Sequence, residues 1–227
     1  MNATLKTKVI WINAAIACPV FMITVLIEGA LRPGYQSLLY PLSSLSIGDT
    51  GWIQIANFIY IGLSIVLFSW GLKKITGEYT EKFKGPILIR LVGIGMIGAG
   101  IFSTDPIFGY PTDQPMVLRQ FTIHGHLHDA FSMLVFICMP WACFVFKKYF
   151  TVNGQHIWAQ YSVYTAYGII VAFILASMGF KQLTGFVSYA GLFQRICVSL
   201  GLAWLTSISI YLYKLDSKKN YDRLINI

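Results

Sequence analysis

The sequence predicts an all-α, multi-pass membrane protein: one domain, residues 1–227, built as a bundle of six transmembrane helices with both termini in the cytoplasm. Composition, the spacing of apolar stretches and the distribution of positive charge support this fold class. Apolar residues make up 56% of the chain and charged residues 11%, against roughly 25% charged in an average soluble domain. This composition excludes an ordinary soluble enzyme.

Six apolar stretches have the length of a membrane-crossing helix, which needs about 20 residues for a hydrocarbon layer of about 30 Å. They cover about residues 9–31, 53–72, 86–102, 127–146, 158–178 and 191–213. The first follows Lys6 and Lys8 and is longer than the apolar core of a signal peptide, so we expect it to be a retained helix. The third opens at Pro86, a residue suited to the first helical turn. Little length is left for a separate soluble domain.

The positive charges predict the orientation. Of the 17 lysines and arginines, only Arg32, Arg119, Lys181 and Arg195 fall on one side, and the other thirteen lie on the side of the termini. Cytoplasmic segments carry the excess of positive residues, so both termini are expected inside. We expect a multi-pass protein of a prokaryotic inner membrane, whose net charge of +8 meets lipid headgroups and not nucleic acid.

Glycines concentrate in the third stretch, at Gly93, Gly95, Gly98 and Gly100. Small residues allow transmembrane backbones to approach closely. The pattern therefore predicts that this helix lies in the centre of the bundle.

Most residues with chemical potential fall in two long outer connections, about residues 32–52 and 103–126, and at the start of the fourth stretch. The densest group is His124, His126, His128 and Asp129. His124 and His128 are four residues apart and share a helix face, and such a pair can bind one metal ion. We therefore predict His124, His128 and Asp129 as ligands of a divalent metal such as zinc. The chain has 4 histidines, too few or wrongly placed for a di-iron or di-haem membrane enzyme, and we expect neither haem nor nucleotide.

Asp105 and Arg195 are the other two candidates. Asp105 precedes Pro106 and could reach the start of the fourth helix, although it is equally typical of a turn or a helix cap. Arg195 falls within the sixth apolar stretch, where a charge should pair or line a water-filled cavity. Its expected partner is Asp105, Asp129 or Glu28. We predict that Asp105, His128 and Arg195 come together at the outer end, as catalytic residues or as a structural network.

Several short motifs occur in a recognisable order. They are Arg32-Pro-Gly-Tyr35, Leu42-Ser-Ser44, Gly51, Asn57-Phe-Ile-Tyr-Ile-Gly62, Phe102-Ser-Thr-Asp-Pro106, Gly125-His-Leu-His128 and Gly191-Leu-Phe-Gln-Arg195. In order and spacing the chain resembles, over about residues 10 to 213, the prokaryotic family catalogued as domain of unknown function 998. The resemblance implies a six-helix membrane bundle and marks Arg32, Ser44, Asp105, His128 and Arg195 as family-pattern positions. It implies no activity.

Three functions fit these residues. The first is a metal-assisted hydrolase acting on a lipid or other amphiphile at the outer leaflet, with a metal-activated water. In that function Arg32, Tyr35, Ser44 and Arg195 would bind the substrate, the arginines holding an anionic headgroup. The second is a small proton- or ligand-linked transporter or binding protein, in which histidine titrates near neutral pH. The third is a structural or assembly protein without catalysis. The sequence leaves these open, together with the substrate and the oligomeric state.

Overall fold

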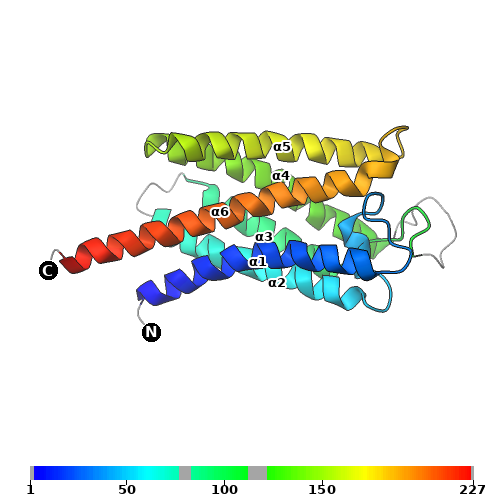
Figure 1. Ribbon diagram of the computed structural model, residues 1–227, viewed down its shortest axis with the longest axis horizontal. Coiled ribbons are helices and arrows are strands. Elements are labelled where there is room, and N and C mark those ends of the chain that lie inside the picture. Colours follow the sequence, from blue (N-terminus) through cyan, green and yellow to red (C-terminus); the bar gives the residue numbers. More distant parts are fainter. Residues whose placement is uncertain (1–2, 77–82, 112–121, 226–227) are drawn as a thin grey trace.

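The computed structural model describes residues 3–76, 83–111 and 122–225, with side chains for 7–73, 83–111 and 122–217. Within these ranges the chain forms α1 (Ala3–Leu31), η1 (Leu42–Ser46), α2 (Gly51–Thr76), α3 (Gly85–Ile101), α4 (Ile123–Val152), α5 (His156–Phe180), η2 (Val187–Tyr189) and α6 (Ala190–Ile225) (Figure 1). The prediction of an all-α fold with six main helices is confirmed. Arg119, which the charge count used, lies outside the described residues.

Two of the helix boundaries that differ from the sequence prediction bear on the site and on the bundle ends. α4 begins at Ile123 and not near residue 127, because Thr122 is its N-cap and the Thr122 side chain accepts a hydrogen bond from the Gly125 amide. Such a cap satisfies a backbone N–H that the first helical turn leaves open. α6 continues to Ile225, well beyond the predicted end at residue 213.

The helices have the dimensions of membrane spans. Five of them (α1, α2, α4, α5 and α6) are long and apolar enough to cross a membrane, and α3 is apolar but shorter. Trp52 and Trp70 are both more than half exposed on α2, about 27 Å apart at the helical rise of 1.5 Å per residue. Exposed tryptophans mark the two membrane interfaces, and this separation matches one hydrocarbon layer of about 30 Å.

The six helices form a ring. Each packs against the next in chain order, and α6 closes the ring against α1. Both chain ends lie at the same end of the bundle, which we call the proximal end (Figure 1). At the opposite, distal end lie the described connecting residues 32–50, 102–111, 122 and 181–189 (Figure 1).

The glycines of α3 do pack closely, but the prediction that α3 occupies the centre is wrong. A Cβ atom on Gly93 would lie 2.7 Å from the Gly62 carbonyl oxygen of α2, and one on Gly95 would lie 2.7 Å from the Phe131 carbonyl oxygen of α4. Close approach on two sides makes α3 a wall of the ring. Its third side is exposed, as Ile101 shows.

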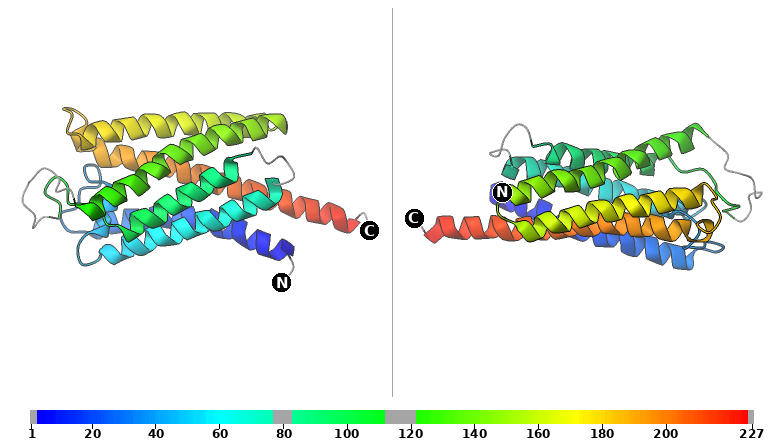
Figure 2. Two further views of the ribbon diagram at one scale, coloured as in Figure 1. Left: turned by 180° about the vertical axis from the view of Figure 1, so that it is seen from behind. Right: turned by 90° about the horizontal axis from the view of Figure 1, so that it is seen from above.

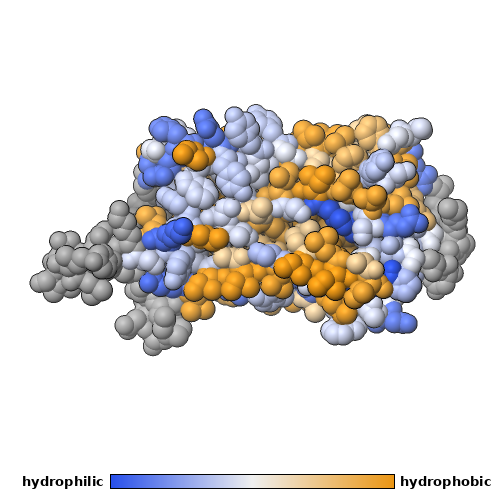
Figure 3. All heavy atoms as spheres, in the orientation of Figure 1, coloured by the Kyte–Doolittle hydropathy of each residue, from blue (hydrophilic) through white to orange (hydrophobic). Residues whose placement is uncertain are grey.

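The outside of the ring is largely apolar. On the face shown in Figure 3, apolar side chains gather over α1 and over the distal parts of α5 and α6. On α1 the exposed apolar residues recur every three or four positions along one side, at Val9, Ile12, Ile16, Val20, Ile23, Leu26 and Ile27. A helix face that is apolar and uncovered by protein is what contact with lipid requires.

Candidate functional site

A cavity of about 660 Å³ opens at the distal end between α4, α5 and α6. We call it the distal cavity. Its polar lining consists of Ser43, Thr104, Asp105, His128, Asp129, Ser132, Ser177, Lys181, Gln182 and Gln194. Its apolar lining consists of Pro41, Ile107, Phe108, Met133, Phe136, Phe173, Ala176 and Phe180. A pocket of this size with a mixed lining is typical of small-molecule sites.

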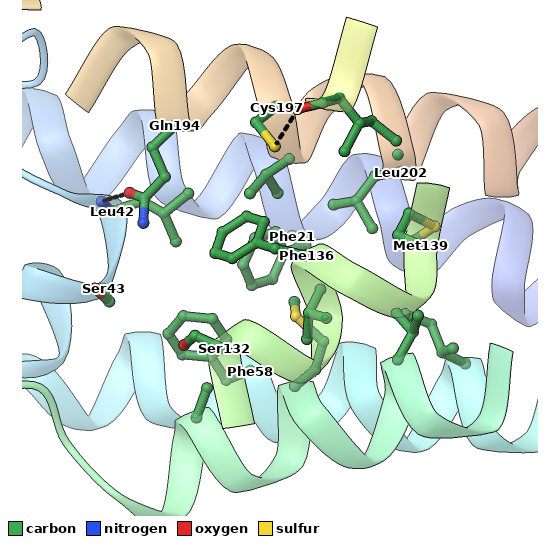
Figure 4. Close-up of a pocket in the computed structure, with 18 residues that line it drawn as sticks. Phe21, Leu42, Ser43, Phe58, Ser132, Phe136, Met139, Gln194, Cys197 and Leu202 are labelled. Carbon is green, nitrogen blue, oxygen red and sulfur yellow. Dashed lines mark hydrogen bonds between the residues drawn. The ribbon is translucent and has the colours of Figure 1, made fainter. Parts of the chain in front are cut away.

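A second, smaller space lies deeper, in the middle of the ring. This inner cavity has a volume of about 50 Å³, and all six helices and η1 contribute to its lining (Figure 4). Apart from Ser43, Ser132 and Gln194, its lining is apolar or weakly polar, with Phe21, Phe58 and Met139 among the residues.

Four residues line both cavities: Ser43, Ser132, Phe136 and Gln194. The Gln194 side chain is fixed there, because its Oε1 accepts a hydrogen bond of 2.8 Å from the Leu42 amide of η1 (Figure 4). The two cavities are therefore neighbours that share a boundary, polar on the distal side and apolar toward the centre.

Asp105 is buried where the α3–α4 connection meets the first turn of α4. Its two carboxylate oxygens accept hydrogen bonds from Thr122, from the amide at 3.0 Å and from the hydroxyl at 2.5 Å. Thr122 in turn accepts the Gly125 amide. A carboxylate beside a helix N-terminus is stabilised by the unpaired amides and the helix dipole. Asp105 thus both caps α4 and lines the distal cavity.

Gly125 makes this arrangement possible. A Cβ atom at that position would lie 1.9 Å from Oδ2 of Asp105, far inside contact distance. The glycine in the His124-Gly125-His126 motif is required for the approach of the aspartate.

His128 is buried one turn further along α4. Its Nδ1 lies 2.8 Å from the carbonyl oxygen of Phe102 and 3.0 Å from that of Ala99, at the end of α3. Carbonyl oxygens only accept, so Nδ1 carries the hydrogen and donates it. In the neutral ring Nε2 is then the basic nitrogen. His128 lines the distal cavity beside Asp105, as the sequence predicted.

The predicted metal ligands do not form one group. His124 is exposed and its ring contacts Phe102, with ring centroids 5.7 Å apart, on the same side of α4 as His128. Asp129 is half-buried and lines the distal cavity. In the described part of the chain, no three His, Cys, Asp or Glu side chains are gathered so that they could hold a metal ion.

Arg195 occupies a different place from the predicted one. It is buried at the start of α6 and does not line either cavity in the described part of the chain. Its guanidinium donates to the carbonyl oxygens of Ser37, Tyr40 and Gly191 and to the hydroxyl of Tyr35. The predictions that it meets Asp105 and His128 and pairs with Asp105, Asp129 or Glu28 are wrong, because residues 32–41 fold back over α6 and supply carbonyl oxygens instead.

Tyr35 belongs to a buried aromatic cluster that joins two connections. Its ring contacts that of Tyr110, with centroids 5.3 Å apart, and Tyr40 contacts both. Burial raises the pKa of Tyr35 to about 12, although the positive charge of Arg195 acts in the opposite direction. Burial also raises the pKa of Tyr110, opposed by Arg32. Both hydroxyls stay protonated at neutral pH.

Arg32 holds the same connection through further hydrogen bonds, and Ser44 is buried within it. Arg32 donates to the carbonyl oxygens of Ile47 and Leu45 and forms an ion pair of 3.1 Å with Glu28. Ser44 is fully buried in η1, and its hydroxyl has no hydrogen-bond partner among the described residues. Arg32, Tyr35, Ser44 and Arg195 were predicted to bind substrate; in the structure they lie together in the packing of the α1–α2 connection.

The sequence reasoning missed Ser132 and Gln194 as cavity residues, and it used Lys181 only for the charge count. One signal was available on α4. Asp129, Ser132, Met133 and Phe136 follow the three-and-four spacing of a single helix face, and the polar residues Asp129 and Ser132 stand on that face in a mostly apolar stretch. Gln194 stands within the motif Gly191-Leu-Phe-Gln-Arg195, but its place beside the cavities depends on the fold of η1.

The ring of long apolar helices defines the chain as a multi-pass membrane protein. It belongs to the DUF998 family, described as "Protein of unknown function (DUF998)", which it matches over residues 15–211. This confirms the resemblance seen in the motifs. No curated protein and no solved structure matches the chain.

Proposed function

We propose that this protein binds a lipid-like amphiphile between its helices, with the polar head in the distal cavity and the apolar chain directed toward the inner cavity. In this proposal α3 is the sixth membrane span and the distal end faces away from the cytoplasm, in accordance with the positive-inside rule. The observation that carries the proposal is the shared boundary at Ser43, Ser132, Phe136 and Gln194 between a polar and an apolar space.

The shapes of the two spaces fit a molecule with two unlike ends. The distal cavity, about 660 Å³ in volume, is within the range of about 300–1,000 Å³ found for small-molecule sites. It offers hydrogen-bonding groups of both kinds, with the cation of Lys181 and the carboxylate of Asp129 in its lining. The inner cavity, about 50 Å³, holds on the order of three or four water-sized groups and so accepts only the tip of a chain.

Binding can be tested at the shared boundary. We expect an amphiphile to remain bound through purification in mild detergent and to be detected by native mass spectrometry. Ser132→Phe places a ring between the two cavities and should lower its occupancy about tenfold, a change of about 1.4 kcal/mol.

Ile137→Phe is the matched control, because Ile137 is exposed on the same helix and lines neither cavity. Its occupancy should equal that of the native protein. Native protein without bound amphiphile, even after incubation with a lipid extract, would contradict the proposal, as would equal occupancy in both variants.

A second candidate function, hydrolysis of the bound amphiphile, is supported by the orientation of His128. A histidine whose Nδ1 hydrogen is held by backbone carbonyls presents Nε2 in a fixed direction, as catalytic and metal-binding histidines do. In this function Nε2 of His128 takes a proton from water as the water oxygen attacks an ester or amide carbonyl of the amphiphile. The tetrahedral intermediate then breaks its bond to the alcohol or amine, which leaves with the proton returned by His128, and the acid is the other product. Asp105 would then act as a positioning residue at the start of α4.

Product release from amphiphile esters by native protein and its loss in His128→Ala would support hydrolysis; equal release from both would contradict it. A metal-assisted form, with His124 and Asp129 turned toward His128, predicts about one zinc ion per chain in native protein and less in His128→Ala. Equal and negligible zinc in both would dismiss that form while leaving amphiphile binding intact.

A further inference from the structure

The distal cavity lies between the distal halves of two neighbouring helices. α4 lines it with Asp129, Ser132 and Met133, and α5 lines it with Phe173, Ala176 and Phe180. Asp129 and Ser132 lie in the second and third turns of α4, and the aromatic residues Phe173 and Phe180 of α5 form the opposite side. A cavity between two adjacent wall helices can open sideways as well as toward the end of the bundle.

The two helices separate toward the distal end. On the proximal side the rings of Phe144 and Tyr167 are in contact, with centroids 5.4 Å apart. Phe136 and Phe173 are in contact at 4.8 Å, and both line the cavity. Figure 2 shows the backbones of α4 and α5 close together near the proximal end and farther apart distally, with α6 behind them in the left view. The contact between Phe136 and Phe173 therefore forms the proximal floor of the distal cavity.

This opening lies at the depth of lipid chains. Gly100 of α3 approaches Phe58 of α2, and Gly98 approaches Phe131 of α4. Phe58 is six residues from Trp52, the exposed tryptophan at the distal interface. At 1.5 Å per residue these steps place Phe131 and Met133 roughly 10–15 Å below that interface. Half of a hydrocarbon layer is about 15 Å thick.

Met133 connects the cavity with the outer surface at this depth. Its side chain lines the cavity and is also 44% exposed. A flexible, apolar side chain that belongs to both surfaces is suited to a gap through which a hydrocarbon chain passes. The polar residue Asp129 lies one turn nearer the distal end, where a lipid head would remain.

We propose that a phospholipid-like molecule of the distal half of the bilayer reaches the cavity sideways, between α4 and α5 past Met133. This inference rests on the proposed amphiphile binding and adds the source of the ligand: the bilayer and not the surrounding water. The chain passes Met133 toward Phe136, and the head stays beside Asp129 and Lys181.

The test uses the full chain reconstituted in vesicles of phosphatidylethanolamine and phosphatidylglycerol. A small fraction of the phosphatidylglycerol carries a photoreactive diazirine in its acyl chain. Cross-links to buried residues such as Phe21 and Met139, which line the inner cavity, report chains that have entered. Met133→Trp should lower these cross-links about tenfold, because the larger side chain narrows the gap.

Two controls separate the possibilities. Ile137→Trp, on the exposed face of the same helix, should leave the internal cross-links unchanged. A water-soluble dihexanoyl phosphatidylglycerol with the same photoreactive group should still label the cavity lining in Met133→Trp, since the substitution does not alter the distal lining residues such as Asp105 and Lys181.

Undiminished internal cross-linking of the bilayer probe in Met133→Trp would overturn sideways access and leave amphiphile binding standing. Loss of labelling by both probes in Met133→Trp would also overturn it, because the variant would then fill the cavity and not close a gap. If neither probe labels the cavity lining of the native protein, the proposed function itself fails.

Discussion

Nδ1 of His128 donates to the carbonyl oxygen of Phe102 across a distance of 2.8 Å and thereby ties the second turn of α4 to the end of α3. Nδ1 also lies 3.0 Å from the carbonyl oxygen of Ala99. These carbonyls belong to the last turn of α3, where helical partners run out. The histidine therefore completes the hydrogen bonding of one helix while it lines a cavity from another.

Replacing this histidine should weaken the protein regardless of any chemistry. His128→Ala leaves two carbonyl oxygens without their donor, and we expect a loss of about 1–3 kcal/mol, measured as a lower thermal unfolding midpoint in detergent. His156→Ala, at an exposed position at the start of α5, should leave the midpoint unchanged. Equal midpoints for both variants would show that the bond to α3 does not contribute.

The contact between Gly125 and Asp105 gives a second prediction. Gly125→Ala places a methyl group 1.9 Å from Oδ2 of Asp105, so the carboxylate must move and the cap through Thr122 is lost. We expect a net loss of about 1–2 kcal/mol, although alanine alone favours a helix by about 1 kcal/mol.

Gly168→Ala in α5 is the control, because the nearest atom there is the flexible Cδ1 of Leu200 at 2.9 Å. Thermal unfolding of the two variants provides the comparison. A Gly125→Ala protein as stable as Gly168→Ala would contradict the role of the close approach.

Arg195 should limit the local opening of the backbone in the α1–α2 connection. In Arg195→Lys a single ammonium group replaces a guanidinium that holds three carbonyl oxygens and the Tyr35 hydroxyl with two nitrogens. We expect backbone hydrogen exchange in residues 33–46 to become about tenfold faster, equivalent to about 1.4 kcal/mol. Arg90→Lys is the control, since Arg90 bonds Ser69 elsewhere. Unchanged exchange in Arg195→Lys would argue against this role.

Tyr35 predicts a loss of stability in strong base. Its pKa in the folded protein is raised to about 12 by burial, above the value of about 10 for an exposed tyrosine. The folded protein binds the Tyr35 proton more tightly than the unfolded chain does, and this difference stabilises the folded state. The stabilisation is fully present below a pH of about 10 and is lost as the pH rises toward about 12. Tyr110, also raised by burial, contributes in the same direction.

The measurement is the unfolding midpoint as a function of pH. Tyr35→Phe should reduce the steepness of the decline above pH of about 10, even though its midpoint at neutral pH is lower. Tyr189→Phe, at a half-exposed site, should decline as steeply as the native protein. A Tyr35→Phe curve with the native slope would contradict the assignment.

The sequence was sufficient for the fold class because a membrane imposes one requirement on every span. Each crossing segment must satisfy its backbone hydrogen bonds internally, so an apolar stretch of sufficient length has to be a helix. The start of α4 was also partly foreseeable, since Thr122 and the small residue Gly125 stand where a cap belongs. The order of helices around the ring was not, because α3 could have been central or peripheral with the same glycines.

For the site, the sequence determined which chemistry was available, and the tertiary structure decided where it went. Asp105 and His128 were predicted to come together, and both line the distal cavity, Asp105 bonded to Thr122 at the start of α4 and His128 to Phe102 at the end of α3. Arg195 was expected beside them, but the backbone of residues 37–40 turns over the start of α6 and takes its hydrogen bonds. Ser132 and Gln194 border the same cavities only because the six helices close into a ring, and side-chain packing at the contacts between helices, which no local pattern specifies, determines that closure.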